Sequence, residues 1–354
     1  MTRDWKRRRR RLMALMAGLL MLGELAAATS PSRRFTLDAL SPLASASELT
    51  SRLLTPVTQD RILKFREKVD FSFREQTIEV GEEPYELFVP EPAADGTYGL
   101  LVFIWPGDEI QVPEGWWKVL RDNHIIYVAS RRSSNVENIF DRRVPLALHG
   151  YEYVRSRYRL APGRVYIGGF SGGSRTAQRV VMAYPDVFHG VLLIGGSDPL
   201  GGESGFTLPS TALSRELQQR TRFVFSTGGN DSPNRAKDAR TRKDLEALCM
   251  QGIRLVPQNG VEHWVPDGRG FGRALKQLEM PVSQRADAGA CAGALDQSIQ
   301  AQLDAVAAKV GSGELDEAGR LLARLDAHYG GLAAPRSVEL SRIIAEKAGL
   351  YELP

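Results

Sequence analysis

Residues 165–184 read VYIGGFSGGSRTAQRVVMAY, and they give the clearest indication of the fold. The β-branched, apolar start predicts a strand at 165–169, and the residues at 174–184 predict a helix. Between them, Gly169-Phe170-Ser171-Gly172-Gly173 forms a turn in which small residues surround one serine. A strand that enters a helix through so tight a turn lifts the serine hydroxyl to the C-terminal edge of a sheet. The sequence therefore predicts Ser171 as a nucleophile; the alternative is a glycine-rich structural turn.

The segments on either side of this turn alternate between strand and helix patterns. Residues 99–105 are a continuous apolar run, which is typical of a strand buried on both faces. Further strand patterns occur at 125–129, 191–194, 222–226 and 253–256. Helical patterns occur at 113–123, 144–158, 234–250 and 270–278. A β-hairpin is expected from 76–80 and 84–89, with Gly81 in its turn. This order predicts an α/β fold with a doubly wound, mostly parallel sheet.

Composition divides the chain into four parts. Residues 1–28 have the features of a signal peptide, and residues 29–57, rich in Ser, Ala, Thr and Pro, predict a linker with at most one short helix. The α/β domain is expected at 58–285. Residues 290–354 are rich in Ala, Leu and charged side chains and predict a helical appendage. A protein partner for that appendage is left open as an expectation.

The N-terminal segment has the order of a secretory signal. Five arginines at 7–11 precede an apolar run at 12–22, and Leu25-Ala26-Ala27-Ala28 gives a small-residue cleavage pattern. The apolar run is about half of the roughly 20 residues that a spanning helix needs. We therefore expect a periplasmic or secreted protein without stable membrane association after cleavage. An uncleaved membrane anchor is the alternative.

The charge distribution argues against a nucleic-acid partner. The chain carries a formal charge of +4, but seven basic and two acidic side chains lie in the first 28 residues. The remaining chain is therefore close to neutral and lacks the basic excess of a nucleic-acid-binding domain.

A serine hydroxyl needs a base, and His263 is the best placed of the five histidines. It alone lies in a loop after a late strand. Asp231 follows the strand pattern at 222–226, so the order Ser171, Asp231, His263 is that of a hydrolase triad. Three other carboxylates remain candidates for the acid: Asp198, Glu262 and Asp267.

The oxyanion hole is expected to use two backbone N–H groups. One is that of Gly172, the residue after the nucleophile, and the other belongs to the loop that follows residues 99–105. Pro106 has no N–H, which leaves Asp108, the favoured donor, and Gly107.

Tryptophans cluster in the segments that should meet at this site. Trp105 adjoins the oxyanion loop and Trp264 adjoins the base, so both are predicted to contact substrate. Trp116 and Trp117 have core packing as their alternative. The long stretch at 198–221 is expected to form a cap over the site.

The chain has two cysteines, Cys249 and Cys291. An even pair in an exported chain predicts a disulfide, with two buried free thiols as the alternative. Closing a loop of about 40 residues would stabilise the fold by about 4 kcal/mol. No cysteine or histidine spacing indicates a metal site.

Residues 75 to 280 resemble the α/β-hydrolase esterases, and most nearly the polyhydroxybutyrate depolymerase and feruloyl esterase group. The resemblance rests on Pro106-Gly107 after a buried strand, the turn at Ser171, Asp231 and His263. It implies a hydrolase of a small-molecule or polymeric carboxylic ester that needs no cofactor. That group usually has a histidine where this chain has Pro106. A serine peptidase and a catalytically inactive binding protein on the same fold are the alternatives.

Overall fold

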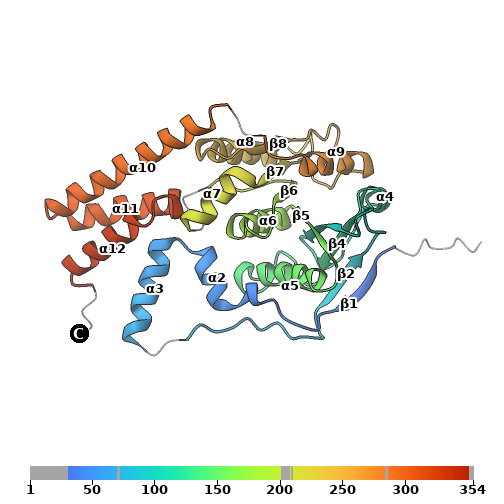
Figure 1. Cartoon of the computed structure of the whole chain (residues 1–354), viewed down its shortest axis with the longest axis horizontal. Coiled ribbons are helices and arrows are strands. Elements are labelled where there is room, and N and C mark those ends of the chain that lie inside the picture. The colour runs from blue at the N-terminus through green and yellow to red at the C-terminus, as the bar shows by residue number, and fades with distance from the viewer. Residues whose placement is uncertain (1–30, 70–71, 201–207, 209, 284–285, 351–354) are drawn as a thin grey trace, which may run out of the picture. The chain divides into compact units, whose positions relative to one another are not determined.

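The computed structural model describes residues 31–69, 72–200, 208, 210–283 and 286–350 (Figure 1). The predicted signal peptide lies outside these residues. The strands are β1 (Arg33–Thr36), β2 (Pro84–Phe88), β3 (Tyr98–Ile104), β4 (Ile125–Ser130), β5 (Leu160–Phe170), β6 (Gly190–Ile194), β7 (Arg222–Phe225) and β8 (Gly252–Leu255). The helices are η1 (Pro42–Ala44), α2 (Ala46–Leu53), α3 (Pro56–Lys68), α4 (Glu114–Asp122), η2 (Ile139–Arg143), α5 (Val144–Arg155), α6 (Gly172–Ala183), α7 (Thr211–Arg220), α8 (Ser232–Ala247), α9 (Gly268–Glu279), α10 (Ala288–Gly311), α11 (Leu315–Tyr329), η4 (Gly330–Leu332) and α12 (Arg336–Lys347).

Within the described residues the strands form one eight-stranded sheet in the order β1-β2-β4-β3-β5-β6-β7-β8. Strand β2 runs antiparallel to β4, while the pairs from β4 through β8 are parallel. Parallel neighbours need crossover helices, and these cover both faces of the sheet. The predicted doubly wound, mostly parallel sheet is confirmed.

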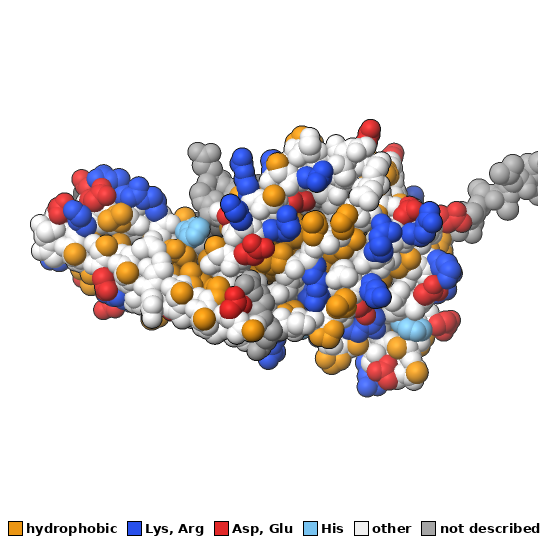
Figure 2. Space-filling view, turned by 90° about the horizontal axis from the view of Figure 1, so that it is seen from above, with side chains coloured by type: hydrophobic (Ala, Val, Ile, Leu, Met, Phe, Trp, Pro, Cys, Tyr) orange, Lys and Arg blue, Asp and Glu red, His pale blue; other side chains and the backbone are white. Residues whose placement is uncertain are grey.

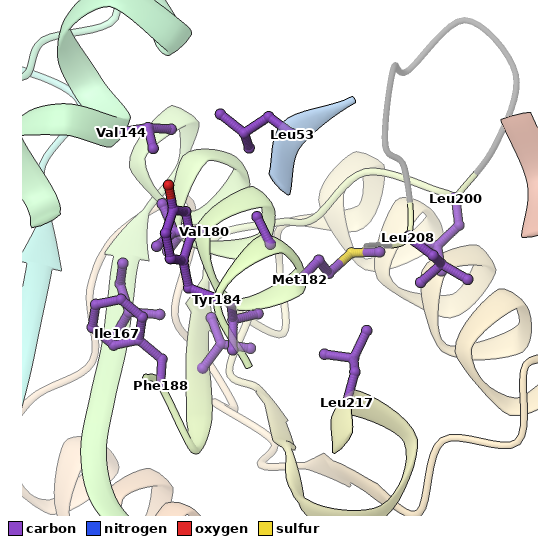
Figure 3. Close-up of a cluster of buried hydrophobic side chains, with 14 of the residues drawn as sticks. Leu53, Val144, Ile167, Val180, Met182, Tyr184, Phe188, Leu200, Leu208 and Leu217 are labelled. Atoms are coloured by element: carbon purple, nitrogen blue, oxygen red, sulfur yellow. The ribbon is translucent and has the colours of Figure 1, made fainter. Parts of the chain in front are cut away.

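Strand alternation divides the core into two layers. On β3, Leu100 and Val102 pack on one face with helices α5 and α6, while Leu101 and Phe103 pack on the other with α4 and α9. Successive side chains on a strand point to opposite faces, so a strand covered on both sides needs a continuous apolar run. Figure 3 shows part of the first layer, which includes Met182 of α6 and Leu217 of α7.

The expected linker at 29–57 is a packed segment in its described part. It contains β1, η1 and α2 and the start of α3, and Leu37, Ala44 and Leu49 are buried. Its hydroxyl side chains cap helices. The Ser45 Oγ accepts a hydrogen bond from the Glu48 N–H at the start of α2, and the Thr55 Oγ1 does the same at the start of α3. Some of the Ser and Thr residues that suggested a linker therefore serve as helix caps.

The predicted hairpin has only its second arm. Residues 84–88 form β2, but residues 76–80 are not a strand. In the sheet, β2 has β1 on one side and β4 on the other, so no edge is left for a hairpin partner. Ile78 is nevertheless buried and contributes to the core.

The stretch expected to form a cap falls partly outside the described residues, which omit 201–207 and 209. The described part includes α7, whose Leu217 is fully buried in the same core cluster as Leu208 (Figure 3). Helix α7 also contacts η4. This part of the stretch therefore belongs to the helical layer.

The C-terminal residues form three helices that pack on one another; α12 also packs on α3, and η4 contacts α3 and α7. Apolar side chains recur every three or four residues along α10 and form one buried stripe. An Arg342–Asp60 ion pair and an Arg61–Ser341 hydrogen bond join α12 to α3. A disulfide between Cys249 and Cys291, with Cα atoms 5.9 Å apart, joins the end of α8 to α10. The partner expected for these helices stays a prediction.

The surface seen in Figure 2 carries basic and acidic side chains side by side. Ion pairs along and between helices include Arg336–Asp304 and Arg215–Asp296. Among the described residues, no helix is long and apolar enough to cross a membrane.

Candidate active site

Ser171 lies at a strained turn between β5 and α6. Its backbone has φ 53° and ψ −118°, a region that residues with a side chain rarely adopt. The Ser171 N–H donates to the Ile194 carbonyl, and the Arg175 N–H donates to the Ser171 carbonyl. Such strain persists only where the surrounding structure enforces it, and it often marks a functional site.

Close packing explains the glycine at 173. A β-carbon there would collide with the Ile104 carbonyl at the end of β3. The turn therefore lies directly against the neighbouring strand, where Ile104 is paired with Gly169. This register places the loop after β3 beside the turn that carries Ser171.

Three side chains form a hydrogen-bonded chain at this edge of the sheet. The His263 Nε2 lies 2.9 Å from the Ser171 Oγ, and the His263 Nδ1 lies 2.6 Å from the Asp231 Oδ2. A carboxylate only accepts, so the Nδ1 carries the proton, and the Nε2 is left to accept from the serine hydroxyl. The structure thus brings together the three residues predicted from the sequence.

The acid and the base come from loops that follow adjacent strands. Asp231 follows β7 and His263 follows β8, and the two loops are joined by backbone bonds. The Gly229 N–H donates to the Gln258 carbonyl, and the Asn230 N–H donates to the Val261 carbonyl. Parallel strands end at the same edge of a sheet, so residues distant in sequence meet there.

Asp231 is buried, with 5 % of its side chain exposed, whereas 43 % of the His263 side chain is exposed. Burial alone would raise the Asp231 pKa. Hydrogen bonds from His263 and from Asn234 outweigh it, and the pKa lies below its ordinary value. The acid is therefore held as a carboxylate that can orient the imidazole and stabilise its charged form.

Asn234 is a site residue that the sequence did not single out. Its Nδ2 donates to both Asp231 oxygens at 2.9 Å. The same atom lies 3.2 Å from the His263 Nδ1, but both atoms carry hydrogens, so this is a contact rather than a hydrogen bond. Asn234 lies one turn into the helix that follows Asp231, and this spacing was the signal available in the sequence.

The residues expected to form the oxyanion hole are Gly172, Gly107 and Asp108. Gly172 opens α6, so its N–H is among the unpaired donors at a helix N-terminus. Gly107 is half-buried and Asp108 is exposed in the loop after β3. The expected donor roles of these three residues stay predictions.

Asn135 was also missed. Its N–H donates to the Pro106 carbonyl at 2.9 Å, and its side chain occupies the position that a β-carbon on Gly172 would take. The loop after β4 therefore packs against both the turn that carries Ser171, here called the elbow, and the loop after β3. Nothing in the residues around Asn135 indicates this contact, because it depends on the order of β3 and β4 in the sheet.

The two predicted substrate-contacting tryptophans lie in different surroundings. Trp105 is 2 % exposed, and its indole N–H donates to the Tyr127 hydroxyl at 2.7 Å, so it is a core residue with almost no surface for a ligand. Trp264 is 48 % exposed and packs edge-on against Phe170, with ring centroids 5.6 Å apart. Trp116 and Trp117 are buried, in line with core packing.

None of the three rival carboxylates takes the place of Asp231 as the partner of the His263 Nδ1. Asp198 forms an ion pair with Arg175 at 3.0 Å, and Asp267 caps α9 by accepting from the Gly270 N–H. Glu262 is exposed beside His263. Among the described side chains, no group of three or more His, Cys, Asp or Glu residues could hold a metal ion.

The topology and the placement of this site identify the architecture. A sheet in the order 1-2-4-3-5-6-7-8 with β2 antiparallel carries the elbow after β5, the acid after β7 and the histidine after β8. The chain has the α/β-hydrolase fold.

No protein-family model matches the chain, and no curated protein matches it. Solved structures of similar proteins include a thermostable esterase, with 20 % identity over 60 % of this chain and a TM-score of 0.40. A feruloyl esterase module from Clostridium thermocellum has 14 % identity over 55 % of this chain and a TM-score of 0.41, with 82 % of that module covered. An acylaminoacyl peptidase from Pyrococcus horikoshii has 12 % identity over 58 % and a TM-score of 0.42. The chain spans 63 % of that esterase and 39 % of that peptidase. Similarities this distant do not transfer an activity, and the function proposed below rests on the site.

Proposed function

We propose that the protein is a serine hydrolase that cleaves a carboxylic ester through an acyl-enzyme. The observation that carries the proposal is the Ser171–His263–Asp231 chain of hydrogen bonds, with distances of 2.9 and 2.6 Å, at a strained elbow on an α/β-hydrolase sheet. A serine hydroxyl is a weak nucleophile, and this arrangement supplies both the base and the group that orients it.

In the first half of the reaction, His263 accepts the Ser171 proton as the Oγ attacks the ester carbonyl. The negative charge moves to the carbonyl oxygen, which the Gly172 N–H and a donor from Gly107 or Asp108 would stabilise. The imidazolium then gives its proton to the alkoxide leaving group, so an alcohol departs and the acyl group stays on the serine.

In the second half, a water molecule takes the place of the alcohol. His263 accepts its proton, the hydroxide adds to the acyl carbon, and collapse of the intermediate returns the proton to the Ser171 Oγ and releases the carboxylic acid. The exposed side of His263 supports this step, because water can reach the imidazole without a conformational change.

Trp264 supports a substrate with a flat or apolar group. It lies next to the base in sequence, is half-exposed and is held by Phe170, which leaves part of the indole open to a ligand. Trp105 is buried and offers no such surface.

Labelling with a fluorophosphonate probe tests the serine mechanism. The wild-type protein should form an adduct at Ser171, and the Ser171→Ala variant should form none. Absence of an adduct from a folded wild-type protein would favour a catalytically inactive binding protein.

The bond that is cleaved is tested separately. We expect p-nitrophenyl acyl esters to be turned over faster than matched peptide anilides, because an alkoxide or phenoxide departs with less proton assistance than an amine. Faster turnover of the anilides would replace the esterase with a serine peptidase.

We further propose that residues 1–28 direct the protein to the periplasm or the medium. The disulfide between Cys249 and Cys291 supports an oxidising destination. Cell fractionation tests this: the full chain should appear in the exported fraction, and a chain lacking residues 2–28 should stay in the cytoplasm.

A further inference from the structure

We infer that Asn234 and Arg175 are positioning residues, a side-chain strap that holds the Asp231 carboxylate for His263 by tying the acid helix α8 to the nucleophile helix α6. The inference rests on the proposed function, since it assigns these residues a part in that reaction. Neither residue is a member of the Ser171–His263–Asp231 chain itself.

The amide of Asn234 connects the two helices. Its Nδ2 donates to both oxygens of Asp231 at 2.9 Å, and its Oδ1 accepts from the Arg175 Nη2 at 2.7 Å. Each residue of the strap lies about one helical turn beyond a catalytic residue: Arg175 after Ser171, and Asn234 after Asp231. The strap therefore spans the same two elements that the triad spans, by a second route.

Arg175 sets which way the amide of Asn234 points. A guanidinium only donates, so the oxygen of the amide must face Arg175 and its nitrogen must face Asp231. Without the cation the amide could turn over and present its oxygen to the carboxylate, and that contact would repel. The strap therefore keeps a donor on the acid at all times.

Arg175 is in turn held from behind. Its Nε donates to the Asp198 Oδ1 at 3.0 Å, and both side chains are about one-fifth exposed. Asp198 is fixed through its backbone, because its N–H donates to the Gln178 Oε1 while its carbonyl accepts from the Gln178 Nε2. Asp198, which the sequence offered as an alternative acid, thus supports the acid through two intermediates.

The loop after β6 leaves room for the strap. Gly196 has φ 117°, and a β-carbon there would lie 2.6 Å from the Asn234 Oδ1 and 2.9 Å from the Arg175 Nη2. Any other residue would be strained by this φ and would press on the Asn234–Arg175 contact. Its neighbour Ser197 is buried and donates to Asp238 below the acid loop.

The strap makes a prediction about pH that packing alone does not make. A carboxylate that loses a donor attracts the protonated imidazole more strongly, so the base should then release its proton only at higher pH. The charged groups around the strap are Asp231, Asp198 with its two partners Arg175 and Arg179, and Asp238, which lies near Arg175 and Arg242. Arg235 donates to the Gly229 carbonyl in the loop before Asp231, and Glu262 and Asp267 flank His263 in sequence. Arg175→Gln removes one of these charges, Asn234→Asp adds a carboxyl group beside Asp231, and Asn234→Ala leaves all of them unchanged.

The experiment measures the second-order rate constant for fluorophosphonate labelling of the full chain as a function of pH. Asn234→Asp is the decisive variant, because it keeps the shape of the side chain and the acceptor for Arg175 but replaces the donor to Asp231 with a negative charge. We expect labelling at pH 7 to fall by at least about tenfold, with the rise in labelling displaced to higher pH. Asn234→Ala and Arg175→Gln should move in the same direction by less.

Arg240→Gln is the matched control, since it removes one arginine from an exposed position on α8, the helix that carries Asn234. It should label like the wild type, and thermal unfolding of every variant checks that the fold is retained. Wild-type pH dependence in both Asn234→Asp and Arg175→Gln would overturn the strap. A wild-type protein that is not labelled at Ser171 would instead overturn the proposed function.

Discussion

Two histidines in two regions of this molecule show how surroundings decide a role. His263 lies at the C-terminal edge of the sheet, 43 % exposed, between a hydroxyl and a carboxylate. His149 lies on α5 with no exposed surface. Its Nδ1 accepts from the Ser41 N–H at 2.9 Å, and its Nε2–H donates to the Gln76 Oε1 at 3.2 Å.

The difference is one of partners and water. Burial lowers the pKa of His149 to about 4, so the ring is neutral and serves as a fixed connector between α5 and the N-terminal segment. His263 has a carboxylate behind it and water in front of it, which is what a group that takes up and releases a proton needs. The first histidine should therefore affect stability, and the second should affect activity.

The largest expected effect is on activity. His263→Ala should lower kcat/KM by about 10⁴-fold or more, since the serine loses its base. The free energy of unfolding should change by less than about 1 kcal/mol, because the ring is partly exposed. Steady-state kinetics and urea unfolding measure the two quantities, with His328→Ala on α11 as the control. A large loss of stability would erase the contrast between the regions.

The complementary change is His149→Ala. It leaves a cavity and removes the acceptor for the Ser41 N–H, so the free energy of unfolding should fall by about 4 kcal/mol. The kcat of the folded molecules should be unchanged. His149→Asn, whose Oδ1 can replace the Nδ1 acceptor, should recover part of the loss. Reduced kcat in folded His149→Ala would show that the two regions are coupled.

The stability of the protein should depend on pH through His149. The pKa of His149 is lowered from 6.5 to about 4 in the folded state, so the unfolded chain binds the proton first as the pH falls. Its contribution to stability is complete above about pH 6.5 and is lost progressively down to about pH 4, by roughly 3 kcal/mol in all. Unfolding curves at several pH values should show this loss in the wild type and a smaller one in His149→Asn. Equal slopes would assign the acid sensitivity to other groups.

The smallest effect is expected at Trp264. Trp264→Ala should raise KM for an aromatic ester several-fold and change kcat little, because the indole would bind substrate without joining the chemistry. Stability should change by less than about 1 kcal/mol, since half of the side chain is exposed. Kinetics with aromatic and short aliphatic esters measure this, and Trp264→Phe is the matched variant. An equal effect on both esters would argue against an aromatic contact.

The sequence predicted the sheet and the residues at its edge because both depend on local patterns. Residues 99–105 had to be apolar throughout to serve two layers, and the glycines around Ser171 were required by the tight turn. The same local patterns gave the wrong result for the N-terminal segment, because Ser and Thr occur both in linkers and in helix caps, and Ser45 and Thr55 are caps. It also assigned a strand to 76–80, because an alternating pattern cannot show whether a sheet edge is free.

The remaining site residues depend on contacts that no local pattern contains. Trp105 follows a strand end, and only its alternation with Phe103 places it in the core beside Tyr127. Asn234 and Arg175 acquire a role from each other, across 59 residues of sequence. Their positions one turn after Asp231 and Ser171 offered a hint, but the orientation of an amide can be worked out only when all of its partners are known.

The bond between Cys249 and Cys291 has a consequence for proteolysis. The segment that it closes, between cysteines 42 positions apart, contains β8, the loop that carries His263, and α9. Asn259, Gly260 and Trp264 are exposed in that loop, where proteases cut most readily. A single cut there would leave both fragments joined through sulfur, and the base would stay on the same covalent body as the nucleophile. Nicked protein would run as one band on a non-reducing gel and as two after reduction.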